Sequence, residues 1–284
     1  MKILILGSSG ILGKRLFISL KKHYKIVHTG LTKRKFNFEK TEEIKKLLLK
    51  EKPSLIINCL AIADIKVCET NKKYSNLINV KILREILKLK KSLNFSFIQF
   101  STDQMYDNKT NLYSKESFNP VIYNEYTRQK INAEKICLKY RCLIFRINFF
   151  GISKSEKKTI SDWVILSFKQ KKLFYLFTDI IFNPLSLSSI CEIIKSLIVS
   201  KKFLKWGIYN LGSKNSLSKA SFAIKVAECL NLKNKNYKLV NSSMIFKIKR
   251  PKNMSMDVSK FEKNFKIKMK TLTYEIKKEY LNLN

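Results

Sequence analysis

The sequence predicts an α/β fold with a doubly wound parallel sheet, followed by a smaller mixed α/β domain. Two observations lead to this prediction. Short apolar runs alternate with segments of helical periodicity over roughly the first 150 residues, which is typical of repeated βαβ units. The chain also opens on an apolar run, residues 2–6, that leads directly into a glycine turn at residues 7–13. A strand, a glycine turn and a helix in that order are typical of a dinucleotide-binding sheet.

The glycine turn places glycine at every third position: Gly7, Gly10 and Gly13. Gly7 would permit a tight turn, Gly10 a close approach of the backbone to a pyrophosphate, and Gly13 close packing of the helix on the strand. The pyrophosphate would lie at the helix N-terminus, where backbone N–H groups are free. The spacing is GxxGxxG rather than GxGxxG, so an ordinary turn is the alternative. Three of the chain's 7 glycines stand here, which favours the binding turn.

The charge balance is strongly basic, with 57 Lys and Arg against 21 Asp and Glu, a formal net charge of +36. Such a balance is typical of nucleic-acid or membrane-surface proteins. Lysine is instead spread along the whole chain, and no basic block is interleaved with aromatic residues in an RNA-binding pattern. We therefore interpret the charge as a composition bias and expect no specific nucleic-acid partner. A basic surface would still favour anionic substrates.

Cysteine usage and hydropathy limit the class of protein. The six cysteines form no C-x-x-C pair and no metal-ligand spacing, so we expect reduced thiols and no metal site. No apolar stretch approaches the ~20 residues that span a bilayer, and the apolar N-terminus is too short for a secretory segment. The expectation is a cytoplasmic protein without membrane insertion.

The first half is predicted to alternate strands and helices in order. The expected strands are 2–6, 25–29, 54–58 and 95–100, and the expected helices are 14–22, 41–49 and 76–91. Thr41 is the expected N-cap of its helix, followed by two glutamates in the first turn, where the helix dipole favours negative charge.

The segment after strand 25–29 bears on the choice of cofactor. An acidic residue there selects NAD, whereas a basic residue accommodates the 2′-phosphate of NADP. The chain has no acid at this point and has Lys33 and Arg34 instead, which favours NADPH, with NADH as the alternative. The other interpretation is that both side chains are simply solvated.

Two features carry candidate chemistry. Thr102 follows strand 95–100, at the carboxyl end of the sheet, where open α/β sheets place ligand groups. Tyr126 and Lys130 are four residues apart and share one face of a helix. A phenol ionises near pH ~10, and an adjacent ammonium favours the phenolate. Such a phenol can protonate the oxygen of a carbonyl that is being reduced, while Thr102 hydrogen-bonds the same oxygen.

The second half has a looser pattern. Helices are predicted at 160–168, 188–199, 216–230 and 272–280, and strands at 173–177 and 209–212. We expect a dinucleotide-binding domain at 1–151 and a substrate domain at 152–284, with a segment near 183–200 returning to the first domain. Trp163 and Trp206 are interpreted as packing residues, with sugar platforms as the alternative.

Several motifs together resemble those of the extended short-chain dehydrogenases/reductases, which have a Rossmann fold, and within them the dTDP-4-dehydrorhamnose reductase family. The resemblance covers almost the whole chain. It rests on the glycine turn, the pair Tyr126 and Lys130, and five further segments: Asn58-Cys-Leu-Ala61, Ser101-Thr-Asp-Gln-Met-Tyr-Asp107, Arg146-Ile-Asn-Phe-Phe-Gly151, Gly207-Ile-Tyr-Asn-Leu-Gly212 and Arg250-Pro-Lys-Asn-Met-Ser-Met-Asp257. Asn183-Pro184 resembles a loop on the substrate side.

The resemblance implies reduction, with NADPH, of the 4-keto group of a nucleotide-linked deoxysugar for surface polysaccharide. The implied catalytic residues are Thr102, Tyr126 and Lys130. The implied cofactor-binding residues are Gly7, Ser9, Gly10, Ile11, Leu12, Gly13, Lys33, Arg34, Asn37, Phe38, Cys59, Leu60, Ala61, Ala63, Asn79, Tyr126 and Lys130. The implied substrate-binding residues are Asp103, Gln104, Met105, Phe149 and Arg250. Arg250 would contact the pyrophosphate or else be a surface arginine. A homodimer is left open.

Departures from the family pattern leave the sugar open. Gln104 stands where the family has tyrosine, Thr127 replaces a glycine, and Phe149 replaces a tryptophan at the sugar. One alternative is an epimerase, which would need further acid–base groups near the sugar; the only histidines, His23 and His28, lie near the second strand. The other alternative is a non-catalytic regulatory subunit that keeps the fold.

Overall fold

The computed structural model describes residues 1–28, 40–110, 113–170, 172–245 and 250–281. The predicted cofactor residues Lys33, Arg34, Asn37 and Phe38 lie outside these ranges. The chain divides into two compact units. Unit 1 comprises Met1–Thr102, Asn124–Phe145 and Ile193–Ile208, and unit 2 comprises Asp103–Tyr123, Arg146–Glu192 and Tyr209–Asn284. Each unit thus contains segments from both halves of the sequence.

A six-stranded sheet has the order β10-β5-β4-β3-β1-β2. Its strands are β1 (Lys2–Leu6), β2 (Lys25–His28), β3 (Leu55–Asn58), β4 (Ser96–Thr102), β5 (Leu143–Ile147) and β10 (Gly207–Leu211). β1 pairs in parallel with β2 on one side and with β3 on the other, and β3 pairs in parallel with β4. The strand order reverses between β1 and β3, so the predicted doubly wound parallel sheet is confirmed.

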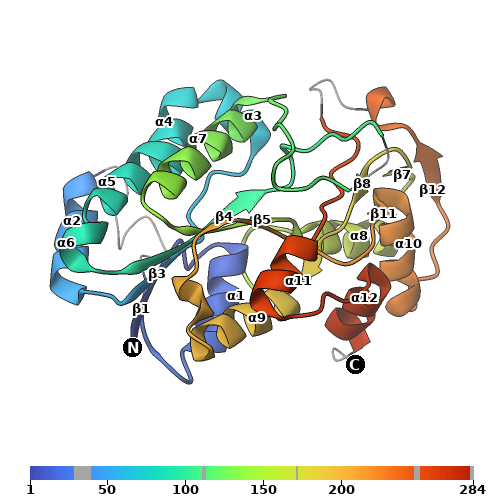
Figure 1. Cartoon of the computed structure of the whole chain (residues 1–284). Coiled ribbons are helices and arrows are strands. Elements are labelled where there is room, and N and C mark those ends of the chain that lie inside the picture. The colour runs from blue at the N-terminus through green and yellow to red at the C-terminus, as the bar shows by residue number, and fades with distance from the viewer. Residues whose placement is uncertain (29–39, 111–112, 171, 246–249, 282–284) are drawn as a thin grey trace. The chain divides into compact units, whose positions relative to one another are not determined.

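Helices flank this sheet on both faces in unit 1. They are α1 (Ile11–Leu20), α2 (Thr41–Glu51), α3 (Ile65–Thr70), α4 (Lys72–Asn76), the π-helical turn η1 (Leu77–Lys81), α5 (Ile82–Lys88), α6 (Lys90–Leu93) and α7 (Glu125–Lys139). Figure 1 shows α3, α4, α5 and α7 on one side of the strands and α1 on the other. Strands covered on both faces need apolar residues at successive positions, which explains the apolar runs in the sequence.

Several helix boundaries differ from the sequence-based expectation; α1, for example, runs from Ile11 to Leu20 rather than over 14–22. Thr41 is the first helical residue rather than the N-cap, which is Lys40 and makes no side-chain capping bond. The helix expected at 76–91 begins earlier, because Asn71 caps α4 by accepting a hydrogen bond from Tyr74 N at 3.1 Å. The run then passes through the π-helical turn and ends at Lys88. Boundaries are set by local capping bonds that apolar periodicity does not reveal.

Unit 2 is built on small sheets and helices around an aromatic core. The paired strands are β7 (Phe174–Phe177) with β12 (Tyr237–Val240), β8 (Ile181–Phe182) with β11 (Leu217–Ser218), and β6 (Phe149–Phe150) with β9 (Leu185–Ser186). The helices are α8 (Ile160–Lys169), α10 (Lys219–Cys229), α11 (Ser259–Phe265) and α12 (Leu272–Tyr280), with 3₁₀ turn η3 at Ser242–Met244. Edge-to-face rings, such as Phe150 with Phe222 at 5.1 Å, fill the core.

Two further elements lie where the chain passes from unit 2 to unit 1 at residues 192–193. Helix α9 (Leu187–Val199) has its first half in unit 2 and its second half in unit 1, and the 3₁₀ turn η2 (Lys202–Leu204) follows it. Across the described residues, no helix is both long enough and apolar enough to cross a bilayer.

Asn183 is the polar centre of unit 2. Its side chain is fully buried and makes three hydrogen bonds, donating to Ser213 O at 2.8 Å and Met256 O at 2.9 Å and accepting from Met256 N at 2.9 Å. It therefore ties together strands and loops that are far apart in the sequence. The resemblance placed this residue in a loop on the substrate side, and its observed contacts are structural.

Replacing Asn183 by alanine should lower the free energy of unfolding of unit 2 by about 2–4 kcal/mol, because three buried backbone groups lose their partner. Urea unfolding followed by Trp163 fluorescence, in a Trp206→Phe background, measures this, because Trp163 lies in unit 2 and Trp206 in unit 1. Asn264→Ala, which removes one bond from a partly exposed amide to Lys260 O, is the control. Equal unfolding midpoints for the two variants would contradict the assignment.

Candidate active site

The glycine turn after β1 is closely packed. Gly7 has φ +73°, and a Cβ added there would lie 2.8 Å from the backbone of Leu60. A Cβ on Gly13 would lie 2.3 Å from Gly7 O, whereas one on Gly10 would meet nothing nearer than 3.3 Å. Real side chains do not tolerate the first two contacts without backbone movement. At Gly7 the turn lies directly against the backbone of the loop after β3, and Gly10 is the least crowded of the three glycines. This close-packed turn at the start of a helix fits a dinucleotide pyrophosphate.

The loop after β3 is held by Asn79 on the π-helical turn. The Asn79 amide accepts a hydrogen bond from Ile62 N at 2.9 Å and donates to Ile62 O at 3.0 Å. It also donates to the Gln129 side chain at 2.7 Å, and Gln129 donates to Ser75 Oγ at 2.9 Å. π-Helical turns occur often at functional sites, where they aim one side chain. In this π-helical turn the side chain is that of Asn79, which is buried and holds the loop after β3 through its two bonds to the Ile62 backbone.

A chain of amides links this loop to β4 and α7. Leu60 N donates to Asn58 Oδ1 at 3.1 Å, and Asn58 Nδ2 donates to Gln99 Oε1 at 2.8 Å. Gln99 Nε2 donates to Phe100 O at 2.8 Å, and the Lys130 ammonium donates to the same carbonyl at 2.6 Å. Every member except Leu60 is buried. Buried polar networks of this kind fix one arrangement, because any unmade bond is costly in a low dielectric.

Lys130 is the buried cation of this network. Burial lowers its pKa from the ordinary value near 10.5 to about 8, against the opposing influence of Glu134 and of the thiols Cys137 and Cys59. The Phe100 carbonyl is the hydrogen-bond acceptor nearest to its ammonium. A lysine whose pKa lies so close to physiological pH is typical of catalytic sites.

The start of α7 is fixed by the side-chain amide of Asn124 and the carboxylate of Glu69. The Asn124 side chain caps the helix by accepting from Thr127 N at 2.9 Å, and the Thr127 hydroxyl donates to the same oxygen at 3.0 Å. Glu69 accepts from Glu125 N at 2.7 Å. Thr127 stands where the resembled family has glycine. It is fully buried, and its hydroxyl reinforces the cap.

Tyr126 lies one turn before Lys130 on the same helix. Its ring is buried and packs against Ile65 and Cys68 of α3. Because α7 connects β4 to β5, it runs back along the sheet, and its N-terminus lies at the carboxyl end of β4. Thr102 is the last residue of β4, so Tyr126 and Thr102 both lie toward the carboxyl end of the sheet.

The residues that follow Thr102 belong to unit 2, where they form a polar cluster. Asp103 Oδ2 accepts from Asn148 Nδ2 at 2.8 Å. Tyr106 Oη donates to Asn210 Oδ1 at 2.7 Å and accepts from Arg146 Nη1 at 2.6 Å. The Arg146 guanidinium also lies 5.1 Å from the centre of the Tyr106 ring, in cation–π contact.

Asp107 joins the two motifs of unit 2 that resembled the family. Its carboxylate accepts from the backbone N–H groups of Lys252 at 2.8 Å and Asn253 at 3.0 Å, and from the Tyr123 hydroxyl. Burial, together with the hydrogen bond to Asp107 and the charge of its carboxylate, raises the pKa of Tyr123 to about 12. The segment that carries Arg250 is therefore held against the segment that carries Gln104.

The predicted site residues differ in accessibility. Seven described residues of the predicted cofactor set are at least partly exposed: Ser9, Gly10, Ile11, Cys59, Leu60, Ala61 and Ala63. The other six described residues of that set are buried: Gly7, Leu12, Gly13, Asn79, Tyr126 and Lys130. Of the substrate set, Gln104, Phe149 and Arg250 are partly exposed, whereas Asp103 and Met105 are buried. Met105 is fully buried, so its side chain packs inside unit 2 in this structure.

Sequence reasoning missed the two glutamines of the site. Gln99 and Gln129 are both buried and each links two elements. A signal existed for Gln99, which interrupts the apolar strand 95–100, because a polar residue buried within a strand needs partners. Gln129 offered none, because polar residues are common on a helix.

The two histidines lie far from this site within the sheet order. β2 is the edge strand, and β1 and β3 separate it from β4. His28, the last residue of β2, packs edge-on against Phe17 at 4.9 Å, and His23 Nε2 lies 3.0 Å from Lys195 Nζ. Neither is placed to act as an acid or base beside Tyr126.

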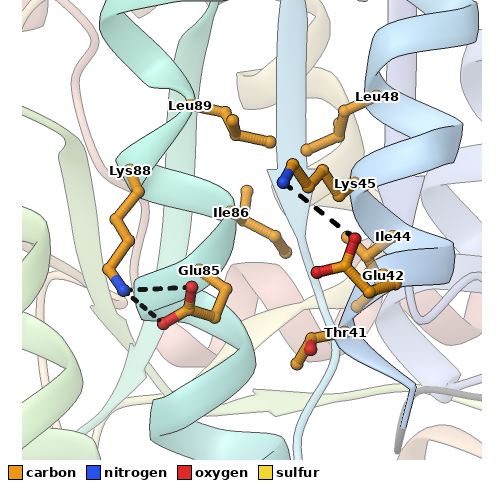
Figure 2. A pocket seen from close by; sticks show the side chains of 9 residues that line it. All are labelled: Thr41, Glu42, Ile44, Lys45, Leu48, Glu85, Ile86, Lys88 and Leu89. Atoms are coloured by element: carbon orange, nitrogen blue, oxygen red, sulfur yellow. Dashed lines mark hydrogen bonds and ion pairs between the residues drawn. The ribbon is translucent and has the colours of Figure 1, made fainter.

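A hollow between α2 and α5 has little binding character. Figure 2 shows its charged side chains pairing with each other, Lys45 with Glu42 at 4.0 Å and Lys88 with Glu85 at 2.8 Å. Its volume is about 140 Å³. Among the described residues, no group of three or more His, Cys, Asp or Glu side chains could hold a metal ion.

Replacing Gly13 by alanine should lower the free energy of unfolding by about 1–3 kcal/mol, because the added Cβ overlaps Gly7 O. It should also weaken NADPH binding, because the turn must move. Gly10→Ala is the matched variant: its Cβ would lie 3.3 Å from Gly7 O, a contact that a shift of a few tenths of an ångström relieves, so its thermal midpoint should fall less than that of Gly13→Ala. NADPH titration by fluorescence and thermal unfolding measure the two effects. A Gly13→Ala midpoint equal to that of Gly10→Ala would contradict the packing argument.

Comparison with known proteins places this fold and site in one class. The sheet, glycine turn and Tyr–Lys helix define an extended short-chain dehydrogenase/reductase fold. The chain belongs to the family described as "RmlD substrate binding domain", which matches residues 1–283. A solved structure of dTDP-4-dehydrorhamnose reductase from Bacillus anthracis, in complex with NADP, superposes with a TM-score of 0.89 at 20% identity, covering 100% of this chain and 99% of that one.

Two curated relatives have different roles. A "probable low-salt glycan biosynthesis reductase" of Haloferax volcanii is 23% identical over 231 residues, covering 78% of this chain and 75% of the relative. Methionine adenosyltransferase 2 subunit beta of Xenopus laevis is 22% identical over 275 residues, covering 92% of this chain and 82% of the relative. The proteins that this chain resembles therefore include both a reductase and a subunit named for another enzyme.

Proposed function

We propose that this protein is an oxidoreductase that uses NADPH to reduce the 4-keto group of a nucleotide-linked deoxysugar. The observation that carries the proposal is the hydrogen bond from Lys130 Nζ to Phe100 O, which ties the helix that carries Tyr126 to the strand that ends at Thr102. The close-packed glycine turn supports a dinucleotide cofactor, and the match to the RmlD family supports a nucleotide-sugar substrate.

The cofactor, when bound, supplies the hydride. Gly7, Gly10 and Gly13 would hold its pyrophosphate, and Cys59 and Leu60 would lie along it. A solved relative in complex with NADP supports the nicotinamide cofactor, and the basic pair Lys33 and Arg34 favours the phosphorylated form.

The chain's own residues handle the proton. Thr102 would donate a hydrogen bond to the substrate carbonyl oxygen and orient it. Tyr126 would transfer its phenolic proton to the same oxygen as negative charge develops there. The Lys130 ammonium would stabilise the phenolate left behind, and the Phe100 carbonyl holds that ammonium in position. The partly exposed Gln104, Phe149 and Arg250 are proposed to contact the substrate.

A regulatory subunit is the second candidate function. The likeness to methionine adenosyltransferase 2 subunit beta over 92% of this chain favours it. That function would need the fold and the glycine turn but no proton donor. Assay of NADPH oxidation with a panel of 4-keto sugar nucleotides separates the two, because a regulatory subunit would turn over none of them while still binding the cofactor.

Replacing Tyr126 by phenylalanine should lower turnover of any accepted 4-keto sugar nucleotide by roughly 10²–10⁴-fold, because the proton donor is removed. NADPH binding should stay within about twofold, because the ring still packs on α3. Steady-state kinetics and NADPH titration measure the two effects. Turnover equal to that of the wild type would overturn the assigned role.

Replacing Glu134 by glutamine should move the alkaline limb of the kcat/KM profile to lower pH. The ammonium of Lys130 is the active form, so activity is present below its pKa and is lost as pH rises through about 8. Glu134 raises that pKa, so removing its charge lowers it further. Glu85→Gln, an exposed residue paired with Lys88, is the control and should leave the limb unmoved. An unmoved limb in Glu134→Gln would assign it to another group.

A further inference from the structure

The loops at the amino-terminal edge of the six-stranded sheet are strongly basic. Because the strands are parallel, the loops that lead into them lie at this edge, opposite the carboxyl ends where the glycine turn stands. Five of these loops contain no Asp or Glu: 21–24, 52–54, 94–95, 140–142 and 200–206. Their basic residues are Lys21, Lys22, Lys52, Arg141, Lys201, Lys202 and Lys205. The fold therefore gathers, at what we call the basic edge, cations that are scattered along the sequence.

Large apolar side chains are exposed among these cations. Val199, which ends α9, is 68% exposed, and Leu204 and Trp206 are 62% and 54% exposed. Trp206, expected from the sequence to be a packing residue, instead keeps more than half of its surface open to solvent. Its ring lies 5.9 Å from the Arg141 guanidinium, in cation–π contact. Apolar and basic groups are therefore mixed on one short stretch of surface.

The turn that carries these side chains is held in one conformation. The Phe203 side chain is buried, which anchors the turn beside exposed Leu204. Leu204 N donates a hydrogen bond to Lys201 O at 3.2 Å, which closes the 3₁₀ turn η2. Gly207 N donates to Cys142 O at 3.0 Å, which joins the start of β10 to the start of β5. Exposure of the apolar side chains is therefore part of the folded structure.

This mixture fits the surface of an anionic membrane better than a nucleic acid. Lys and Arg are attracted to the negative potential of anionic phospholipids, and tryptophan is enriched at the membrane–water interface. An aliphatic side chain gains at that interface by leaving water. A nucleic acid is bound mainly through its phosphates and base edges, which offer little to Val199 and Leu204.

We propose that the basic edge binds the surface of a membrane rich in anionic phospholipid. Leu204 and Trp206 would lie at the boundary between headgroups and acyl chains, with Arg141, Lys201 and Lys205 at the lipid phosphates. The contact would be peripheral, since no helix among the described residues could cross a bilayer. The inference goes beyond the proposed function and does not rest on it, because the basic edge lies at the opposite end of the strands from the glycine turn.

The test is a titration of the full chain with lipid vesicles in a Trp163→Phe background, so that Trp206 reports alone. One vesicle contains phosphatidylcholine and phosphatidylglycerol in equal amounts, and the other contains phosphatidylcholine only. With the anionic vesicles, Trp206 emission should shift to shorter wavelength and should be quenched by brominated acyl chains. The zwitterionic vesicles should cause neither change, and added salt should weaken the binding because it screens the charges.

A matched pair of double variants tests the charge. Lys201→Gln with Lys205→Gln should weaken binding to the anionic vesicles by about 10- to 30-fold, because each cation near such a surface contributes about fivefold. Lys73→Gln with Lys81→Gln removes the same charge from exposed lysines of α4 and η1, outside the basic edge. This second pair should bind as the parent protein does.

A second matched comparison tests the apolar contact. Leu204→Gln leaves the charge unchanged and should weaken vesicle binding by about 3- to 10-fold. Val67→Gln, at an exposed position of α3, should bind as the parent protein does. All of these side chains are exposed, so thermal midpoints should stay at the parent value, which distinguishes lost binding from poor folding.

Three results would overturn the inference. Binding of random-sequence duplex DNA without any Trp206 response to anionic vesicles would make the basic edge a nucleic-acid surface. Equal loss of vesicle binding in the two lysine pairs would show adsorption by total charge, and vesicle binding unchanged in Leu204→Gln would exclude the apolar contact. Vesicle binding that depends on Lys201, Lys205 and Leu204 would support the inference, whether or not the protein oxidises NADPH with a 4-keto sugar nucleotide.

Discussion

The carbonyl of Phe100 is the point on which the candidate active site depends. It accepts hydrogen bonds from both the Gln99 amide and the Lys130 ammonium, so one backbone group joins β4 to α7 and, through Asn58, to the loop after β3. Each of these groups is buried, and each would be costly without its partner. The same bonds that hold the fold together therefore tie the helix that carries Tyr126 to the strand that ends at Thr102.

Stability and chemistry make opposite demands on Lys130. A buried lysine favours its neutral form, and its pKa falls to about 8. Its proposed role needs the ammonium, which Glu134 and the Phe100 carbonyl stabilise. Lys219 in unit 2 meets a similar constraint with fewer compensating groups, since Asp103 alone offsets burial and Arg250. Groups whose pKa is shifted by burial and by neighbouring charges cluster at functional sites.

Local features of the sequence predicted most of the fold. The apolar run before Gly7, the helix ending at Leu20 and the terminal helix at Leu272–Tyr280 all follow from periodicity. The boundary set by the Asn71 cap was missed, and Thr41, the expected cap, is instead the first residue of its helix. The Tyr126–Lys130 spacing indicated a shared helix face, and the structure has both residues buried on α7.

By itself, the sequence determined the order of elements, the glycine turn and the Tyr–Lys face, because each depends on residues within a few positions of one another. The tertiary structure alone decided which amide holds which loop, as with Asn79 on Ile62, Gln99 on Asn58 and Asn183 on Met256. Those contacts join residues tens of positions apart, and their geometry exists only once the chain has packed.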